Sequence, residues 1–335
     1  MKNLTNKQRC YILIPIFVVT IIVLTYLSMN IGYISISVSE VFQTLIGNGT
    51  RENEITLWTL RLPKTAVAII SGMCLAVAGA VMQGVTRNPL ATPSMIGVNS
   101  GASLAILLVV YASDKGLGMP VPLPLAAVLG GLVTFTIVYG LALRYSLSPV
   151  KLILNGIAIN SCIGAISLVL SMKLSADAYT WRSLIMAGSL SYATWDMILV
   201  ALIVSVPLIG FVVYKAFHLN ILNLNEEMAI GLGLNLKKER KNLLYVTVIL
   251  SSVVAYIAGG IGFIGMIAPH IAKRIVGSNY KLFLPLAAFI GMNMILVADL
   301  IARLLSNIEA DVPIGTLLSL IGAPYLLYLL FAEDR

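Results

Sequence analysis

Long apolar runs recur along the whole chain, and each is bounded by charged residues, Pro or Gly. Most are close to the roughly 20 residues that carry a helix across about 30 Å of hydrocarbon. The pattern therefore predicts an all-α membrane protein, with one polytopic domain over residues 1–335 and about ten transmembrane helices. The expected spans are residues 10–30, 62–85, 93–111, 122–144, 152–172, 194–215, 242–259, 263–276, 282–302 and 313–331.

The composition agrees with a bilayer environment. Hydrophobic residues make up 59% of the chain and charged residues 11%, against roughly 45–50% and 25% in soluble domains. A net charge of +8 could indicate a nucleic-acid surface, but the charges lie between the apolar runs and not along one face, which argues against it. Cys10, Cys74 and Cys162 all fall within apolar runs, so we expect no disulfide and no metal site.

The basic residues predict the orientation. The first apolar run is too long for a signal-peptide core and no Ala-x-Ala site follows it, so we expect a retained helix. If the N-terminus is in the cytoplasm, the outer side holds only seven of the 22 Lys and Arg residues. The positive-inside rule favours this orientation. An even number of spans then puts both termini in the cytoplasm. The seven are Arg51, Arg61, Lys64, Lys115, Lys173, Arg182 and Arg303.

Small and polar residues inside the apolar runs mark places where helices meet. Gly72, Ala76, Ala80 and Gly84 repeat every four residues, which predicts a smooth face for a close helix contact. The glycine-rich stretch 259–265 predicts a break covered by protein or by a water-filled cavity. A carboxylate is costly in lipid, so Asp299 is either a functional group or the partner of another polar side chain.

The longest polar connection, residues 216–241, is expected on the cytoplasmic side. Its composition favours short helices, and the glycines near Ala229 suggest a compact docking element, with a solvated charge run as the alternative. The residues singled out there are Glu226, Ala229, Gly231, Leu232, Gly233 and Leu234.

The sequence carries no recognisable catalytic motif. It has no Gly-x-x-x-x-Gly-Lys-Ser/Thr phosphate loop, no paired nucleophile and base, and no metal-ligand spacing. His270 has no visible partners for a catalytic or metal role. We therefore expect a transport protein without a cofactor of its own, in which any ATPase must be a separate subunit. An ion-coupled transporter is the alternative, supported by Asp299 alone.

Four groups of motifs follow one another in order between residues 60 and 330. They are residues 61–64 with 87–93, residues 229–234, residues 262–270, and residues 298–303 with 322–324. Together they resemble the FecCD-type permease family, the membrane subunits of type II ATP-binding-cassette importers for iron-siderophores, haem and cobalamin. Thr92, Ile96 and Ile185 depart from the family pattern, and they leave the transported substrate open.

The resemblance implies the partners and the location. It implies a multi-pass protein of a bacterial plasma (inner) membrane that works with two ATPase subunits, which bind ATP and Mg²⁺. It also implies an extracytoplasmic substrate-binding protein and a second permease subunit, identical or not. A ferric siderophore is the expected substrate, with cobalamin or haem as alternatives.

The resemblance also implies roles for individual residues. Residues 216–241 would form the loop that couples the permease to the ATPase. Arg61, Lys64 and Arg303 would dock acidic side chains of the binding protein. For these cations, interfacial snorkelling is the alternative, and an ion pair with Glu309 or Asp311 is a further one for Arg303.

The cytoplasmic gate is the third implied site. The turn Asn88, Pro89 and Leu90 would narrow the inner end of the pathway, or it is a plain turn, since proline ends a helix. Asn155 and Asn160 would line the path, or they make hydrogen bonds between helices.

Overall fold

A computed structural model describes residues 5–32, 36–117, 121–143, 149–306 and 312–333. Within these ranges all regular structure is helical. The helices are α1 (Asn6–Asn30), α2 (Val38–Leu45), α3 (Arg51–Glu54), the π-helix η1 (Ile55–Arg61), α4 (Leu62–Thr86), the 3₁₀ turn η2 (Pro93–Ile96), α5 (Val98–Asp114), α6 (Leu123–Leu143), α7 (Pro149–Ser171), α8 (Ala176–Met186), α9 (Trp195–Tyr214), α10 (Ala216–Leu222), α11 (Glu226–Gly231), α12 (Leu236–Ile257), α13 (Ile264–Val276), α14 (Tyr280–Ser306) and α15 (Ile314–Glu333).

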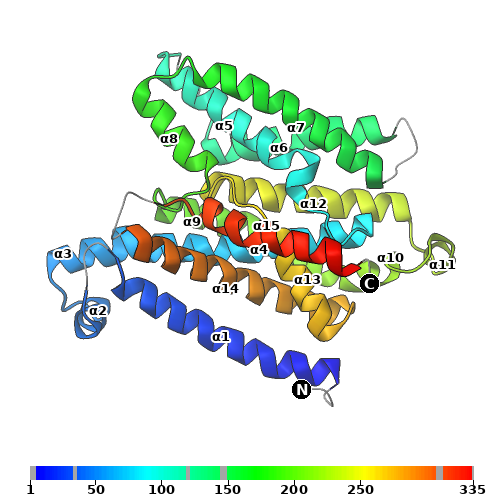
Figure 1. Cartoon of the computed structure of the whole chain (residues 1–335), viewed down its shortest axis with the longest axis horizontal. Coiled ribbons are helices and arrows are strands. Elements are labelled where there is room, and N and C mark those ends of the chain that lie inside the picture. Colours follow the sequence, from blue (N-terminus) through cyan, green and yellow to red (C-terminus); the bar gives the residue numbers. More distant parts are fainter. Residues whose placement is uncertain (1–4, 33–35, 118–120, 144–148, 307–311, 334–335) are drawn as a thin grey trace.

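The long helices lie roughly side by side (Figure 1). α4 is the central element, packed against α14, α12, α13 and α9. α12 also contacts α5 and α6, and so joins this group to the layer formed by α5, α6, α7 and α8. α1 lies at the edge: 6% of its most apolar stretch is buried, against 83% for α4. The low fraction indicates that α1 faces lipid, and the high fraction indicates that α4 lies in the core.

Both described ends of the chain lie at the same end of the bundle as α10 and α11 (Figure 1). We call this the inner end and the opposite one the outer end, following the distribution of Lys and Arg. Glu309 and Asp311, the alternative ion-pair partners of Arg303, lie outside the described ranges.

Each of the ten predicted spans contains a helix, which confirms the all-α membrane architecture. Seven of the described helices are long and apolar enough to cross a bilayer, and α5 and part of α15 are shorter apolar helices. The predicted start of the third span was wrong. Pro93 opens a separate 3₁₀ turn, and Gly97 adopts a left-handed conformation (φ 87°) before α5 begins.

Glycines permit the closest helix contacts. A Cβ atom on Gly72 would overlap the backbone of Gly291 in α14, and one on Gly84 would overlap the Tyr280 hydroxyl. The predicted smooth face of α4 is therefore confirmed as a contact with α14. Gly79, on another side of α4, lies against the backbone of Gly265 in α13.

The break predicted at residues 259–265 is also confirmed. α12 ends at Ile257, and α13 begins at Ile264 directly after Phe263, whose φ of 64° is unusual for a residue with a side chain. The ring of Phe263 lies against Gly322 of α15, where a Cβ would overlap it. The turn is thus covered by protein, as freed backbone in a membrane requires.

Candidate functional site: polar clusters at the two ends of the bundle

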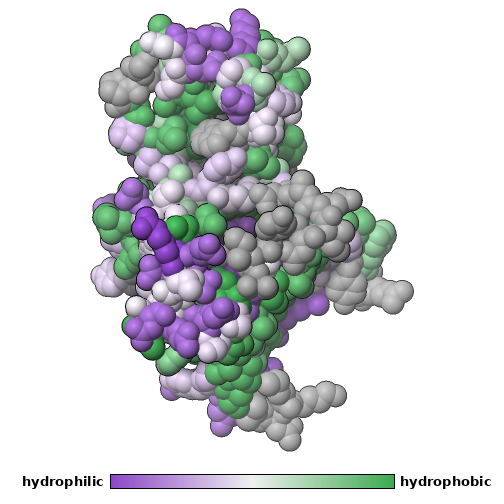
Figure 2. All heavy atoms as spheres, turned by 90° about the vertical axis from the view of Figure 1, so that its left-hand side faces the viewer, coloured by the Kyte–Doolittle hydropathy of each residue, from purple (hydrophilic) through white to green (hydrophobic). Residues whose placement is uncertain are grey.

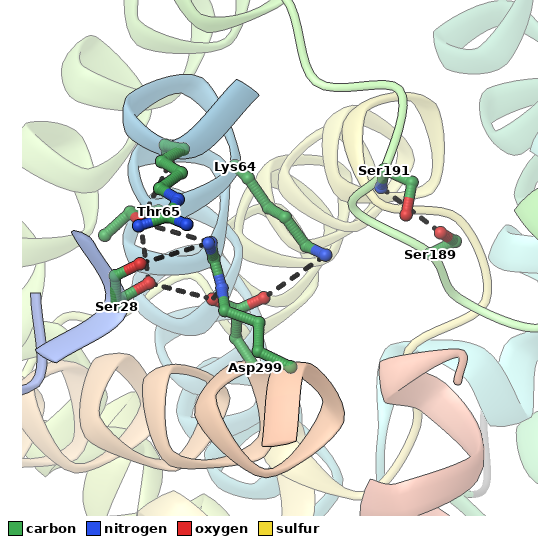
Figure 3. Close-up of polar contacts among 8 residues, drawn as sticks. Ser28, Lys64, Thr65, Ser189, Ser191 and Asp299 are labelled. Carbon is green, nitrogen blue, oxygen red and sulfur yellow. Dashed lines mark hydrogen bonds and ion pairs between the residues drawn. The ribbon is translucent and has the colours of Figure 1, made fainter. Parts of the chain in front are cut away.

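Asp299 lies at the centre of a buried charge cluster at the outer end (Figure 3). The Arg303 Nε donates a hydrogen bond to Asp299 Oδ2 at 2.8 Å, and Lys64 Nζ lies 3.8 Å from Oδ1. The Ser28 hydroxyl donates to Oδ2 at 3.2 Å. Asp299 is therefore the partner of other polar side chains, which is one of the two explanations expected for a carboxylate within an apolar run.

The end of α1 binds the two arginines of this cluster. The Arg61 guanidinium donates to the carbonyl of Met29, and Arg303 Nη1 donates to that of Ser28 at 3.1 Å. Both carbonyls belong to the last turn of α1, where backbone oxygens lack helical partners and the helix dipole is negative. The arginines therefore tie α1 to α4 and α14.

The cluster contains more positive than negative charge. Arg61 and Arg303 are 4% and 6% exposed and Asp299 is 0% exposed, whereas the Lys64 side chain is 19% exposed. Lys64 and Arg303 pair with Asp299, and Arg61 is a third cation close to Arg303. The burial of both arginine side chains does not fit snorkelling into water, and Glu309 and Asp311 lie outside the described residues. Docking of a partner protein by these cations stays a prediction.

The inner connection is folded into two short helices, as its composition predicted. α10 and α11 precede α12, which starts at Leu236 and so includes the end of the expected loop. Arg240 Nη2 lies 2.7 Å from Glu226 Oε1, and Lys215 Nζ lies 2.8 Å from Glu239 Oε1. The hydrogen bond from Arg240 and its positive charge hold the pKa of the Glu226 carboxyl below its ordinary value.

Gly233 ends α11 in a Schellman motif. Its φ is 83°, its N–H donates to the Ile230 carbonyl at 2.8 Å, and the Leu234 N–H donates to the Ala229 carbonyl at 3.1 Å. Ala229 is fully buried, whereas the side chains of Ile230 and Leu232 are exposed. The connection is therefore a compact element with an exposed apolar face, and the alternative of a solvated charge run does not hold.

The expected gate residues lie in a structured turn after α4. The Asn88 side chain accepts a hydrogen bond from the Leu90 N–H at 2.9 Å, which closes the turn around Pro89. Arg87 Nε donates to the Leu222 carbonyl at 3.1 Å and so links the turn to α10. The turn and α10 are therefore in direct contact.

α7 brings one of the two predicted asparagines to the same connection. Asn160 Nδ2 donates to the Ser94 carbonyl of η2 at 3.1 Å, which is a hydrogen bond between helical elements. Asn155 is half-buried on the same helix. Gly156 lies so close to the carbonyl of Met95 that a Cβ would overlap it. The structure thus brings Asn160, but not Asn155, into a polar contact with the α4–α5 connection.

A basic cavity of about 660 Å³ opens beside this turn at the inner end. Arg87, Lys273 and Arg274 line it together with His270 and Pro89. In the part of the chain that the structure describes, no three His, Cys, Asp or Glu side chains come close enough to hold a metal ion. His270 lines this positively charged cavity.

Sequence reasoning missed the hydroxyl groups of the outer cluster. Ser28 Oγ and Thr65 Oγ1 lie 3.1 Å apart, and Arg303 Nη2 lies 3.5 Å from the Thr65 hydroxyl. The four-residue spacings of Arg61 to Thr65 and of Asp299 to Arg303 are signals that could have found part of this set. Nothing in the sequence links Ser28 to residues more than 270 positions away.

These features define a class of protein. Polar clusters lie at the two ends of an apolar helical bundle, and the inner one is a folded surface element in contact with an interhelical turn. This arrangement suits a polytopic membrane-transport protein.

Comparisons with known proteins give the family. The FecCD transport family matches residues 20–332. The Iron(3+)-hydroxamate import system permease protein FhuG of Bacillus subtilis is 37% identical over 341 residues, which cover 100% of both chains. The hemin transport system permease protein HmuU of Yersinia pestis is 34% identical, covering 98% of each. The chain therefore belongs to the FecCD transport family.

A solved structure supports the same fold. It is described as an inward-facing conformation of a candidate metal-chelate type ATP-binding-cassette transporter. Its TM-score is 0.82 at 26% identity, over 96% of this chain and 99% of that one. The chain is accordingly a multi-pass permease of the cell membrane, of the ATP-binding-cassette importer class that takes up iron chelates or haem.

Proposed function

We propose that this permease imports ferric siderophores, and among them ferric hydroxamates. The observation that carries the proposal is the full-length match to a hydroxamate permease, 37% identical over all of both chains. A second relative, the iron-uptake system permease protein FeuC of Bacillus subtilis, is 35% identical over 96% of this chain. Haem is the second candidate, because HmuU also matches over 98% of its length.

The inner element would receive the ATPase. Met228, Ile230 and Leu232 project exposed apolar side chains from α11 and its C-terminal end, 59–62% exposed in each case. Such a face next to charged residues suits a docking contact between proteins. Two ATPase subunits, with ATP and Mg²⁺ bound to them, would act on two permease subunits through this face.

The outer cluster would receive the extracytoplasmic binding protein. Arg61, Lys64 and Arg303 give it an excess of positive charge, which attracts acidic side chains and speeds association at low salt. Lys64 is the most exposed of the three, so we assign the first contact to its ammonium group. The two arginines would then hold the docking site in place through α1.

The ion-coupled alternative is weakened by the contacts of Asp299. A coupling carboxylate must bind and release an ion near the middle of the membrane. Asp299 instead lies in the C-terminal part of α14, beside the last turn of α1, and is bonded to Arg303 at 2.8 Å. Its charge is balanced within the protein, which suits a structural role.

Transport in proteoliposomes tests the proposal. The permease is reconstituted with its partner ATPase and binding protein, and uptake of ⁵⁵Fe-labelled ferrichrome is compared with uptake of haem and of cobalamin. We expect ATP-dependent uptake of ferrichrome above that of the other two. Preferred uptake of haem or cobalamin would refute the siderophore assignment, and uptake without ATPase would refute the importer mechanism.

A further inference from the structure

We propose that α2 is an amphipathic anchor that lies in the outer leaflet of the membrane. The helix starts with a capping box, in which the Ser37 hydroxyl accepts from the Glu40 N–H and the Glu40 carboxylate accepts from the Ser37 N–H. Such a cap stabilises a helix of only eight residues. Nothing in the transport mechanism above requires this helix.

α2 has an exposed apolar face beside its buried one. Val38, Phe42 and Leu45 follow one another at helical spacing and are 60%, 65% and 43% exposed. Ser39 and Gln43, both exposed, lie about a quarter turn further around the helix, opposite the buried Val41 and Thr44. A helix with one apolar face open and one polar face open is typical of the membrane interface.

The other side of α2 attaches it to the bundle. Val41 is buried in a small apolar cluster with Met29, Ile36 and Leu57, which come from the outer end of α1, the start of the α2 segment and η1. The helix is therefore held at a defined position, and its apolar face is not simply the underside of a loose loop.

The position and direction of α2 suit the lipid surface. Figure 1 shows α2 nearly end-on beside the outer end of α1, so its axis runs across the long helices and along the membrane plane. In Figure 2, which faces the outer end, a strip of apolar spheres runs through the lower part beside hydrophilic ones. α1, which α2 contacts, exposes apolar side chains as well, among them Ile22, Val23 and Tyr26.

The contact with lipid would affect the outer cluster. Met29, which packs on the same side as Val41, provides the carbonyl that accepts a hydrogen bond from Arg61. An α2 seated in the headgroup layer would therefore fix the height of the Arg61 side chain relative to the membrane surface.

Spin labelling of the full chain in lipid nanodiscs tests the proposal. Cys162 is exposed and is replaced by Ser, whereas Cys10 and Cys74 are buried. Single nitroxide labels are then placed by F42C on the apolar face and by Q43C on the polar face, with I22C in α1 as the lipid reference. Relaxation by oxygen, which enters lipid, is compared with relaxation by a water-soluble nickel chelate.

We expect the oxygen-to-nickel ratio at position 42 to approach that at position 22 and to exceed that at position 43 severalfold. Equal ratios at 42 and 43 would show a helix in water and overturn the proposal. A label at 42 that neither reagent reaches would show that protein covers this face, which would overturn it as well. Size-exclusion chromatography of each labelled variant confirms that the bundle is intact.

Discussion

Arg303 lies one helical turn beyond Asp299 on α14, and its Nε donates to Asp299 Oδ2 at 2.8 Å with both side chains buried. Asp299 pairs with two cations, Lys64 and Arg303. Removing its charge leaves those cations without compensation, which is costly in a buried site. The pair is therefore a structural requirement of the outer end, whatever protein docks there.

The first prediction concerns Asp299→Asn, which keeps the size of the side chain and removes its charge. We expect the variant to lose about 3 kcal/mol of stability, as when one partner of a buried ion pair is removed. Thermal unfolding of the purified protein in mild detergent measures the change. Glu52→Gln, at an exposed carboxyl on α3, is the control and should change stability by less than about 0.5 kcal/mol. Equal stability of the two variants would contradict the structural role.

A second prediction concerns the closest helix contact. Gly79→Ala places a Cβ against the Gly265 carbonyl, and we expect a loss of about 1–3 kcal/mol from overpacking between α4 and α13. Gly210→Ala is the matched control, because no atom lies within 4 Å of its added Cβ. It should leave the midpoint of unfolding unchanged or raise it. If both variants unfold alike, the α4–α13 contact does not depend on glycine.

The third prediction tests the exposed face at the inner end. Ile230→Asp should abolish co-purification of the ATPase, because a carboxylate replaces an apolar side chain that is 61% exposed. The protein should still reach the membrane, since Ala229 and the Schellman motif are untouched. Leu117→Asp, at an exposed residue of the outer end, is the control and should retain the ATPase. Undiminished binding to the Ile230 variant would contradict the docking assignment.

The membrane fold was predictable because length and hydropathy report it directly. Each span needs about 20 apolar residues, and this signal needs no knowledge of contacts. Two outer helices, α2 and α8, were not predicted because they are too short for that signal. The start of α5 was also missed, since the local chemistry of Pro93 and Gly97 ends one element and begins another within an apolar run.

The candidate site was predictable residue by residue but not as an arrangement. Arg61, Lys64 and Arg303 were singled out as cations on the sparsely charged side, and Asp299 as a costly carboxylate. That they contact one another depends on the packing of α1, α4 and α14, which sequence spacing does not encode. The burial of Arg61, Arg303 and Asp299 is therefore visible only in the structure.

The inner element gives the last prediction, which concerns pH. Arg240 lowers the pKa of Glu226, so the ionised carboxylate stabilises α11 fully above its ordinary pKa of about 4.5. That contribution is lost only as the pH falls through the lowered value. Because the Glu226 side chain is 56% exposed, the pair should be worth no more than about 1 kcal/mol.

Glu226→Gln should therefore speed hydrogen exchange of the α11 amides about two- to fivefold at pH 7, and the ratio to the unmodified protein should be the same at pH 6. Glu227→Gln is the matched control, because it removes a charge from the same first turn of α11 and so has the same effect on the helix dipole. Exchange that rises equally in both variants would show that the dipole, and not Arg240, accounts for the effect. A ratio that changes between pH 7 and pH 6 would place the pKa of Glu226 above its ordinary value and contradict the pairing.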